Sequence, residues 1–112
     1  MSNRIAGKII VCDTAATQIG GSMPSTSMPK GPLVILAIKW VGTQNAARDI
    51  AQNDDLLIRW GDVNGTVGIE CRAQEATPNQ QAYSVEFSDS WIADNGLYID
   101  QIDGGELQIF LK

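Results

Sequence analysis

The stretch Asn95–Lys112 (NGLYIDQIDGGELQIFLK) decides the fold class of this chain. Hydrophobic residues occupy every second position of Leu107–Leu111, and Leu97–Ile99 begins with the same alternation. Successive side chains of a β-strand point to opposite faces of a sheet, so this pattern predicts two strands, each with one buried face. The segment Asp103–Gly105 between them predicts a hairpin turn, because glycine accepts the positive φ angles of tight turns.

Length and composition predict one ordered domain over residues 1–112. A chain of this length buries about two-thirds of its unfolded surface, and 44% hydrophobic with 19% charged residues is ordinary for a globular protein. The net charge of −5 and the scattered Lys and Arg residues argue against nucleic-acid binding. No apolar run approaches the ~20 residues of a membrane span. We therefore expect a protein that is made in a cytoplasm and binds neither nucleic acid nor membrane.

The sequence lacks histidine and the motifs of common catalytic and metal sites. The chain has no histidine, which is the commonest general base and metal ligand. Neither a Gly-x-Ser-x-Gly elbow nor a phosphate-binding glycine loop occurs, and the acidic residues near turns lack calcium-loop spacing. Cys12 and Cys71 match no metal-ligand spacing, so we interpret them as buried free thiols. We predict no enzymatic activity, no metal site and no cofactor.

The remaining hydrophobic patterns predict further strands. Leu33–Val41 is the most hydrophobic run, and its length predicts a central strand covered on both faces. Ile5–Cys12 predicts one strand near the amino terminus. Gly42–Asp55 is ambiguous, since Ala46–Ala51 would fit either a loop or a single helical turn.

A hairpin and another strand are predicted in the middle of the chain. Leu56–Trp60 and Thr66–Arg72 alternate on either side of an Asn64-Gly65 turn. Tyr83–Phe87 predicts a strand that ends at the polar residues 88–90. Together these patterns predict an all-β fold, an antiparallel β-sandwich or small barrel of about seven to eight short strands. The side chains expected to face inward in the hairpin are Leu56, Ile58, Trp60, Val67, Ile69 and Cys71, with Arg59 facing outward.

The segment 14–31 interrupts the strand pattern and is predicted to be a flexible loop or arm. It is rich in Gly, Pro, Ser and Thr and lacks hydrophobic periodicity. Long loops of this kind in compact domains are usually functional or disordered. In the functional interpretation the arm docks on a neighbouring subunit, with methionines as adaptable apolar contacts. The candidates for partner contact are Met23, Pro24, Met28 and Pro29. Both methionines are expected to be exposed.

Three segments resemble a group of small virion-associated proteins of tailed bacteriophages. They are Ile38–Gly42 (IKWVG), Gly96–Ile99 (GLYI) and Asp103–Leu111 (DGGELQIFL). Those proteins carry an Ile-x-Trp-Val-Gly strand opening, a middle hairpin and an ending of the form Gly-Leu-x-Val/Ile, then Asp-x-Gly-x-Leu-x-Ile-Tyr/Phe-Leu. The resemblance covers Ile38–Leu111. It implies an all-β, non-enzymatic component of a virus particle with no catalytic residues to transfer.

On this resemblance we expect a virion structural protein, made in the host cytoplasm, that decorates or cements the phage head. Its expected partners are the major capsid protein or other virion proteins, and further copies of itself in a homo-oligomer. The alternatives are a tail- or connector-associated module and a module that binds host-surface carbohydrate. The tryptophans would serve the last role, but Trp40 and Trp60 fall on apolar strand faces, which favours core packing.

Overall fold

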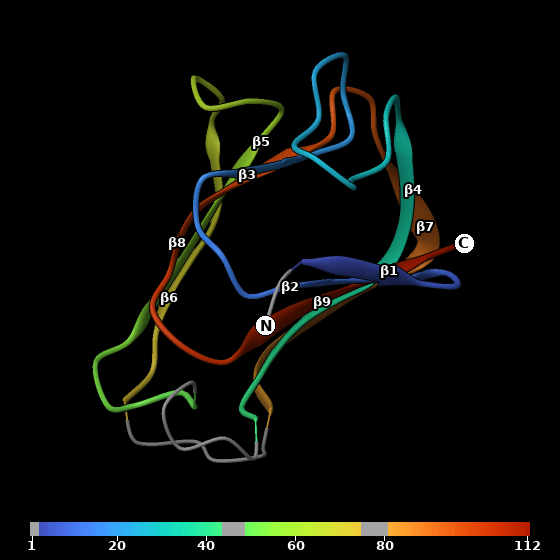
Figure 1. The fold of residues 1–112 in the computed structure, drawn as a ribbon. Coiled ribbons are helices and arrows are strands. Elements are labelled where there is room, and N and C mark those ends of the chain that lie inside the picture. The colour runs from blue at the N-terminus through green and yellow to red at the C-terminus, as the bar shows by residue number, and fades with distance from the viewer. Residues whose placement is uncertain (1–2, 44–48, 75–80) are drawn as a thin grey trace.

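The computed structural model describes residues 3–43, 49–74 and 81–112. These residues form nine strands in two antiparallel sheets that pack face to face as a sandwich (Figure 1), which confirms the predicted all-β class. Within those ranges there is no helix, and hence none long and apolar enough to cross a membrane. In chain order the strands are β1 (Arg4–Ala6), β2 (Ile9–Cys12), β3 (Thr17–Ile19), β4 (Leu33–Val41), β5 (Asp55–Trp60), β6 (Val67–Arg72), β7 (Gln81–Ala93), β8 (Leu97–Ile102) and β9 (Glu106–Leu111).

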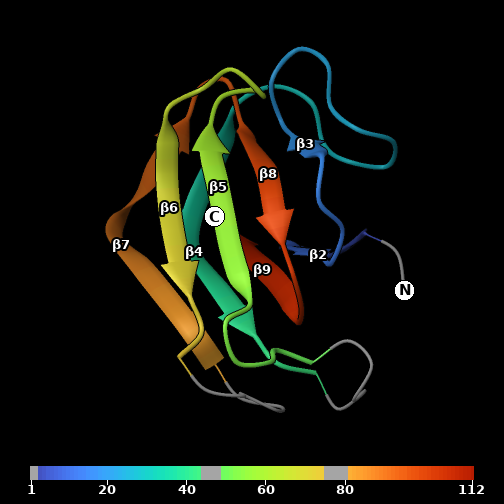
Figure 2. The same ribbon diagram turned by 90° about the vertical axis from the view of Figure 1, so that its left-hand side faces the viewer.

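The two sheets differ in size and enclose one hydrophobic core. The five-stranded sheet has the order β1-β2-β9-β4-β7, and the four-stranded sheet has the order β3-β8-β5-β6. Figure 2 shows β6, β5 and β8 in front of the five-stranded sheet. The alternation in Asn95–Lys112 identifies the buried face of both its strands correctly. The fully buried side chains between the sheets include Ile10, Ile35, Ile38, Trp40, Leu56, Ile58, Leu97, Ile99, Leu107 and Ile109.

The predicted hairpin at the end of the chain is wrong, because β8 and β9 belong to different sheets. β8 pairs with β3 and β5, whereas β9 pairs with β2 and β4. The glycines between β8 and β9 let the backbone pass close to neighbouring segments as it crosses from one sheet to the other, and they do not form a two-residue hairpin turn. A Cβ atom at Gly105 (φ +67°) would overlap the carbonyl oxygen of Val41, and one at Gly104 would lie 2.5 Å from that of Asp49. The chain thus changes sheets where only glycine fits.

Two strand predictions in the first half of the chain need correction. Ile5–Cys12 is not one strand, because Gly7 (φ +62°) turns the chain between β1 and β2. β4 has the predicted bounds, but it is not covered on both faces. Leu36 lies on the outer face, where it is 41% exposed, and a bulge follows it, so that Ala37 and Ile38 are both buried. A bulge adds one residue to a strand and re-aims the side chains around it.

The predicted hairpin of β5 and β6 is confirmed. Leu56 lies opposite Cys71, and Ile58 lies opposite Ile69. The prediction that Val67 faces inward is wrong, since this side chain is 41% exposed. A bulge between Ile58 and Arg59 pairs Arg59 with Val67 and so turns Val67 to the outer face.

The structure also extends the strand predicted at Tyr83–Phe87. β7 continues to Ala93, and the expected break at residues 88–90 is an irregularity inside the strand, where Ser90 has φ +70°. Its register against β4 shifts from the Ala37–Glu86 pair to the Ile35–Trp91 pair. Residues 46–48 of the helical turn considered for Ala46–Ala51 lie outside the described residues, and Asp49, Ile50 and Ala51 are not helical.

Candidate functional site

Three chain segments meet at one end of the sandwich. They are the β3–β4 loop (residues 20–32), the β5–β6 turn (residues 61–66) and the β7–β8 turn (residues 94–96), all drawn at the top of Figure 1. The Gly61 amide donates to the Gly96 carbonyl oxygen over 3.0 Å, which joins the second segment to the third. We call these three segments together the loop end. Loops held by a rigid scaffold are where binding residues concentrate.

One side chain of β3 ties the three segments together. The amide nitrogen Nε2 of Gln18 lies 2.8 Å from the Gly61 carbonyl oxygen, 3.2 Å from that of Gly20 and 3.4 Å from that of Asn95. Each of these acceptors belongs to a different segment. Gln18 is not a candidate from sequence, because it lies in a stretch whose lack of hydrophobic periodicity predicts a loop.

Replacing Gln18 with alanine is expected to lower the free energy of unfolding by about 1–2 kcal/mol, because three carbonyl oxygens lose a shared donor. Gln18→Glu is the matched variant, since it keeps the size but turns a carboxylate toward the same oxygens. It should be at least as destabilising at pH 7. Urea unfolding followed by circular dichroism measures both, and an unchanged free energy of unfolding in Gln18→Ala would contradict the role.

The β3–β4 loop folds back on the body of the protein. Gly21 and Gly31 exchange two backbone hydrogen bonds of 2.8 and 2.7 Å, and the Gly20 amide donates to the Pro29 carbonyl oxygen over 2.9 Å. The start of the predicted arm is a strand, β3, in which Ile19 is fully buried. The interpretation of residues 14–31 as one long loop is therefore wrong for Thr17–Ile19, whose alternation is too short to indicate a strand.

The four candidates for partner contact lie in this loop but differ in exposure. Met23 is 84% exposed, whereas Met28 is only 7% exposed and packs in the core. Pro24 and Pro29 are half-buried. The prediction that Met28 is exposed is wrong, because its side chain anchors the loop to the core. Met23 is the candidate that projects fully from the surface.

Other exposed hydrophobic side chains accompany Met23. Val63 lies in the β5–β6 turn, Val67 follows it at the start of β6, and Ile92 precedes the β7–β8 turn. Single exposed hydrophobic residues are normal, whereas large contiguous patches mark contact surfaces. Among the large hydrophobic side chains exposed in the described ranges, only Ile5 and Leu36 lie outside this group.

Two hollows lie at the loop end. One has a volume of about 400 Å³ and is lined by Gln18, Met23, Asp62 and Asn95 among others. The other has a volume of about 330 Å³ and extends along Trp91, Ile92 and Asp94. Trp60 lines both hollows.

The Trp60 side chain contacts both β6 and β7, which are edge strands of different sheets. Its ring centroid lies 4.7 Å from that of Trp91, whose own centroid is 5.6 Å from that of Phe87. A Cβ atom at Gly68 would overlap the Trp60 indole, so the ring lies directly over the β6 backbone. Core packing, predicted for Trp40 and Trp60, is confirmed for the buried Trp40, whereas Trp60 is only partly buried.

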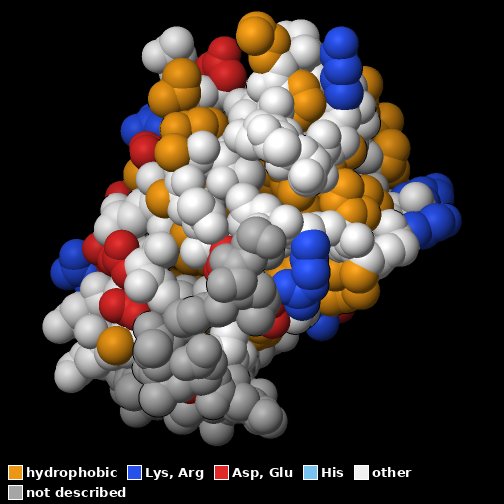
Figure 3. Space-filling view, viewed as in Figure 1, with side chains coloured by type: hydrophobic (Ala, Val, Ile, Leu, Met, Phe, Trp, Pro, Cys, Tyr) orange, Lys and Arg blue, Asp and Glu red, His pale blue; other side chains and the backbone are white. Residues whose placement is uncertain are grey.

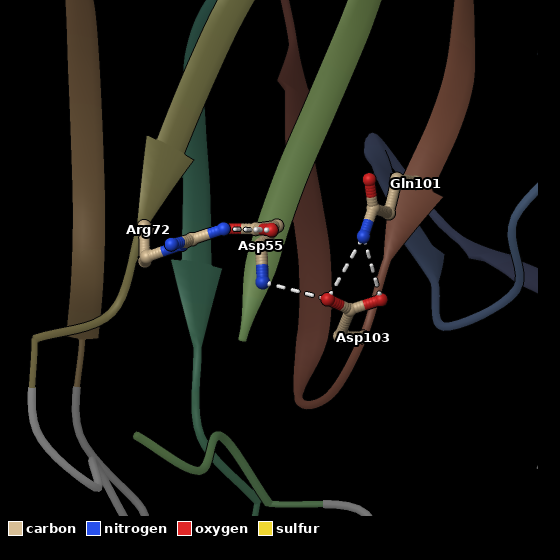
Figure 4. A network of polar contacts seen from close by, with 4 residues as sticks. All are labelled: Asp55, Arg72, Gln101 and Asp103. Atoms are coloured by element: carbon tan, nitrogen blue, oxygen red, sulfur yellow. Dashed lines mark hydrogen bonds and ion pairs between the residues drawn. The ribbon is translucent and has the colours of Figure 1, made fainter. Parts of the chain in front are cut away.

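A polar network lies at the opposite end of the four-stranded sheet (Figure 4). Arg72 donates to both carboxylate oxygens of Asp55 over 2.7 and 3.0 Å. The Asp55 amide donates to Asp103 over 2.9 Å, and Gln101 donates to both Asp103 oxygens over 3.0 and 2.9 Å. These contacts link the ends of β5, β6 and β8 where the chain crosses from β8 to β9. The network therefore has a structural role.

The hydrogen bonds from Arg72, together with its charge, lower the pKa of the Asp55 carboxyl below 3.8, its ordinary value. A carboxyl with a lowered folded-state pKa stabilises the fold above its unfolded pKa and loses that contribution as pH falls through the folded value. Asp55→Asn should thus be less stable than the parent by a constant, small amount above about pH 5, since exposed pairs contribute little. Urea unfolding at pH 7 and pH 3 tests this. A difference that grows at pH 3 would contradict it.

Both cysteine thiols have raised pKa values. Burial and the nearby charge of Asp13 raise the pKa of Cys12 to about 12, and burial with the charge of Asp55 raises the pKa of Cys71 to about 11. Both cysteines are free; Cys12 is buried as predicted, and Cys71 is half-buried. In the part of the chain that the structure describes, no three His, Cys, Asp or Glu side chains are placed to hold a metal ion.

Comparison with protein-family models, with curated proteins and with solved structures finds no match to this chain. The class of protein is defined by the fold, which is an antiparallel β-sandwich with two hollows and several exposed hydrophobic side chains at the loop end.

Proposed function

We propose that this chain is a non-enzymatic structural protein of a bacteriophage particle. It decorates the head and contacts the major capsid protein, or another virion protein, through the loop end. The observation that carries the proposal is the fixed placement of Met23. This side chain is exposed, yet its loop is held by the Gly21–Gly31 hydrogen bonds and by the buried Met28.

The physical argument concerns the cost of ordering a contact surface. A loop already held by hydrogen bonds has little conformational freedom left to lose when a partner binds. Methionine adapts its shape to the partner because its side chain is unbranched and polarisable. The resemblance of Ile38–Leu111 to virion-associated proteins supports the choice of a virus particle as the partner.

Quantitative mass spectrometry of purified particles tests this proposal. We expect a copy number near that of the major capsid protein for the parent chain, and at least a tenfold loss for Met23→Asp. Ile5→Asp is the matched control, because it places the same charge on an exposed hydrophobic position of β1. Absence of the parent chain from particles would overturn the virion role, and equal incorporation of Met23→Asp would overturn the contact through the loop end. A handful of copies would favour the tail or connector alternative.

Binding of host-surface carbohydrate is the second candidate function. It is favoured by Trp60 and Asn95, which line both hollows, and by Asp62, which lines the larger one. An aromatic ring beside a few polar groups is a common arrangement in binding pockets. Titration with purified host polysaccharide should then quench tryptophan fluorescence, and Asn95→Ala should weaken this quenching. Fluorescence that does not change at saturating polysaccharide would exclude this candidate.

A further inference from the structure

The hydrophobic core is incompletely covered along one side of the sandwich. Seven hydrophobic side chains of the described ranges pack against the core but are only partly buried, and six of them lie on or beside the edge strands β6 and β7. These six are Trp60, Cys71, Tyr83, Val85, Phe87 and Trp91. In Figure 2, β7 forms the left-hand margin of the described strands, beyond β6. A second molecule that approaches this side therefore meets β7 first.

The other sheet edges in the described part of the chain offer less to a partner strand. β1 and β3 have three residues each, and short edge strands are one way in which proteins prevent unwanted pairing. On the side that carries β1 and β3, which faces the viewer in Figure 3, hydrophobic side chains are interspersed with polar and charged ones. β7 has thirteen residues and pairs with β4 without a register shift over residues 83–86. It is thus the edge best suited to the addition of a strand.

The middle of β7 directs backbone groups to the outside of the sheet. In an antiparallel ladder, the N–H and C=O groups of successive residues point alternately to one neighbouring strand and to the other. The amide of Lys112 donates to β4, and the alternation counted from it along β9 directs the backbone of Ile38 to β7. Val85 lies opposite Ile38 and so faces β4, which leaves Ser84 and Glu86 facing the open edge. Neither of these two makes a hydrogen bond beyond the strand pair within the described residues.

We propose that two copies of this chain pair through β7, antiparallel across a two-fold axis at Val85, and so join their five-stranded sheets into one. A two-fold contact uses the same surface of both copies, as most homodimers do. In this register Ser84 of each copy lies opposite Glu86 of the other, and both residues face the partner with their backbone groups. An axis at Glu86 would instead place two carboxylates directly opposite each other, which is destabilising. The inference goes beyond the proposed virion role and does not depend on it.

The same register completes the burial of the hydrophobic row on β7. Val85 lies opposite its own copy, and Tyr83 lies opposite Phe87 of the second copy. These are the non-hydrogen-bonded positions of the ladder, where opposite side chains approach most closely. Cross-strand pairs of two aromatic side chains stabilise a sheet, and the removal of apolar surface from water adds to this. The contact therefore covers the side on which the core is open.

Sedimentation velocity of the full chain tests the inference at concentrations from about 1 µM to about 1 mM. We expect the parent to change from monomer to dimer as concentration rises. Ser84→Pro removes an amide that donates to the second copy, and the monomer accepts proline because this amide faces outward from an edge strand. It should weaken association at least about tenfold, since each copy loses one hydrogen bond to the other. Ser84→Ala is the matched control, which keeps the amide and should associate like the parent.

Disulfide cross-linking tests the register. Non-hydrogen-bonded partners of an antiparallel pair have Cα atoms about 4.5 Å apart, within the range of about 4.4–6.8 Å that a disulfide spans. Under mild oxidation, Val85→Cys should therefore form a covalent dimer, because this position faces itself across the axis. Ser84→Cys should not, because its opposite residue is Glu86. Both variants carry Cys71→Ser as well, which removes the half-buried natural thiol. If Ser84→Pro fails to fold, this pair of variants still decides the question.

Three outcomes would overturn the inference. The first is a parent chain that remains a monomer throughout the concentration range, which leaves the virion role standing because single copies also decorate particles. The second is self-association that Ser84→Pro leaves unchanged, which would place the contact away from β7. The third is cross-linking of Ser84→Cys but not of Val85→Cys, which would move the axis. Absence of the chain from particles would instead remove the virion role without bearing on a measured β7 contact.

Discussion

Replacing Gly96 with alanine is expected to lower the free energy of unfolding by about 3–5 kcal/mol. Gly96 has φ +73°, a left-handed conformation that costs about 1–2 kcal/mol in residues with a Cβ atom. Its Cβ would also overlap the Ile19 carbonyl oxygen and lie 2.9 Å from the Cα of Gly20. The backbones of β3 and of the β3–β4 loop would have to move away. Urea unfolding measured by circular dichroism gives the loss directly.

Gly7→Ala is the matched control for this prediction. Gly7 has φ +62°, but no atom lies within 4 Å of the position that its Cβ would take. It therefore carries the conformational cost without the overlap, and the expected loss is about 1–2 kcal/mol. Equal losses in the two variants would mean that the close approach at Gly96 relaxes at no cost, which would contradict the prediction. A loss of about 3–5 kcal/mol is a large part of the roughly 5–15 kcal/mol typical of a domain.

Replacing Trp40 with alanine should cost about 3–5 kcal/mol of stability, as expected for deletion of a large buried side chain. Trp40 is 1% exposed and lies between the sheets. Its indole nitrogen donates to the Gly104 carbonyl oxygen over 2.9 Å, and so holds the crossing from β8 to β9 against β4. The alanine variant loses the packing and the hydrogen bond together. Far-UV circular dichroism is the appropriate probe, because the substitution also removes a fluorophore.

Two companion variants separate the contributions at Trp40. Trp40→Phe keeps most of the apolar volume but leaves the Gly104 carbonyl without its donor, so an intermediate loss of about 1–3 kcal/mol is expected. Trp60→Ala removes the same side chain from a half-buried position at the loop end, and it should cost less than Trp40→Ala. The prediction fails if Trp60→Ala proves to be the more destabilising of the two.

The strand positions and inward faces follow from local sequence. Alternation locates Leu107 and Ile109 on the buried face, and the hydrophobic run Leu33–Val41 gives β4 its observed bounds. The Asn64-Gly65 pair correctly predicts the β5–β6 turn, where Asp62 accepts hydrogen bonds from the Asn64 and Gly65 amides. These features depend on side-chain period and on turn residues, which act within a few positions of the chain.

The loop end is only partly predictable from sequence. Met23 is a candidate from composition, and the structure places it at the surface. Its neighbours Trp60 and Asn95 lie far away in sequence and meet it only through folding, in the hollow that all three line. Gln18, which joins the three segments, carries no local signal, because a single polar residue reveals its hydrogen-bond partners only in three dimensions.

The all-β class and the buried faces of most strands can be read from the amino-acid sequence, because hydrophobic period is a local property. The separation of β8 and β9 into different sheets depends on tertiary packing, since a strand pairs with neighbours distant in the chain and the Asp103–Gly105 segment fits either a turn or a crossing. The bulge in β4 that leaves both Ala37 and Ile38 buried, and the bulge that turns Val67 outward, are likewise visible only in the folded protein. A bulge shifts the pairing register, and one shifted residue reverses the face of every side chain beyond it.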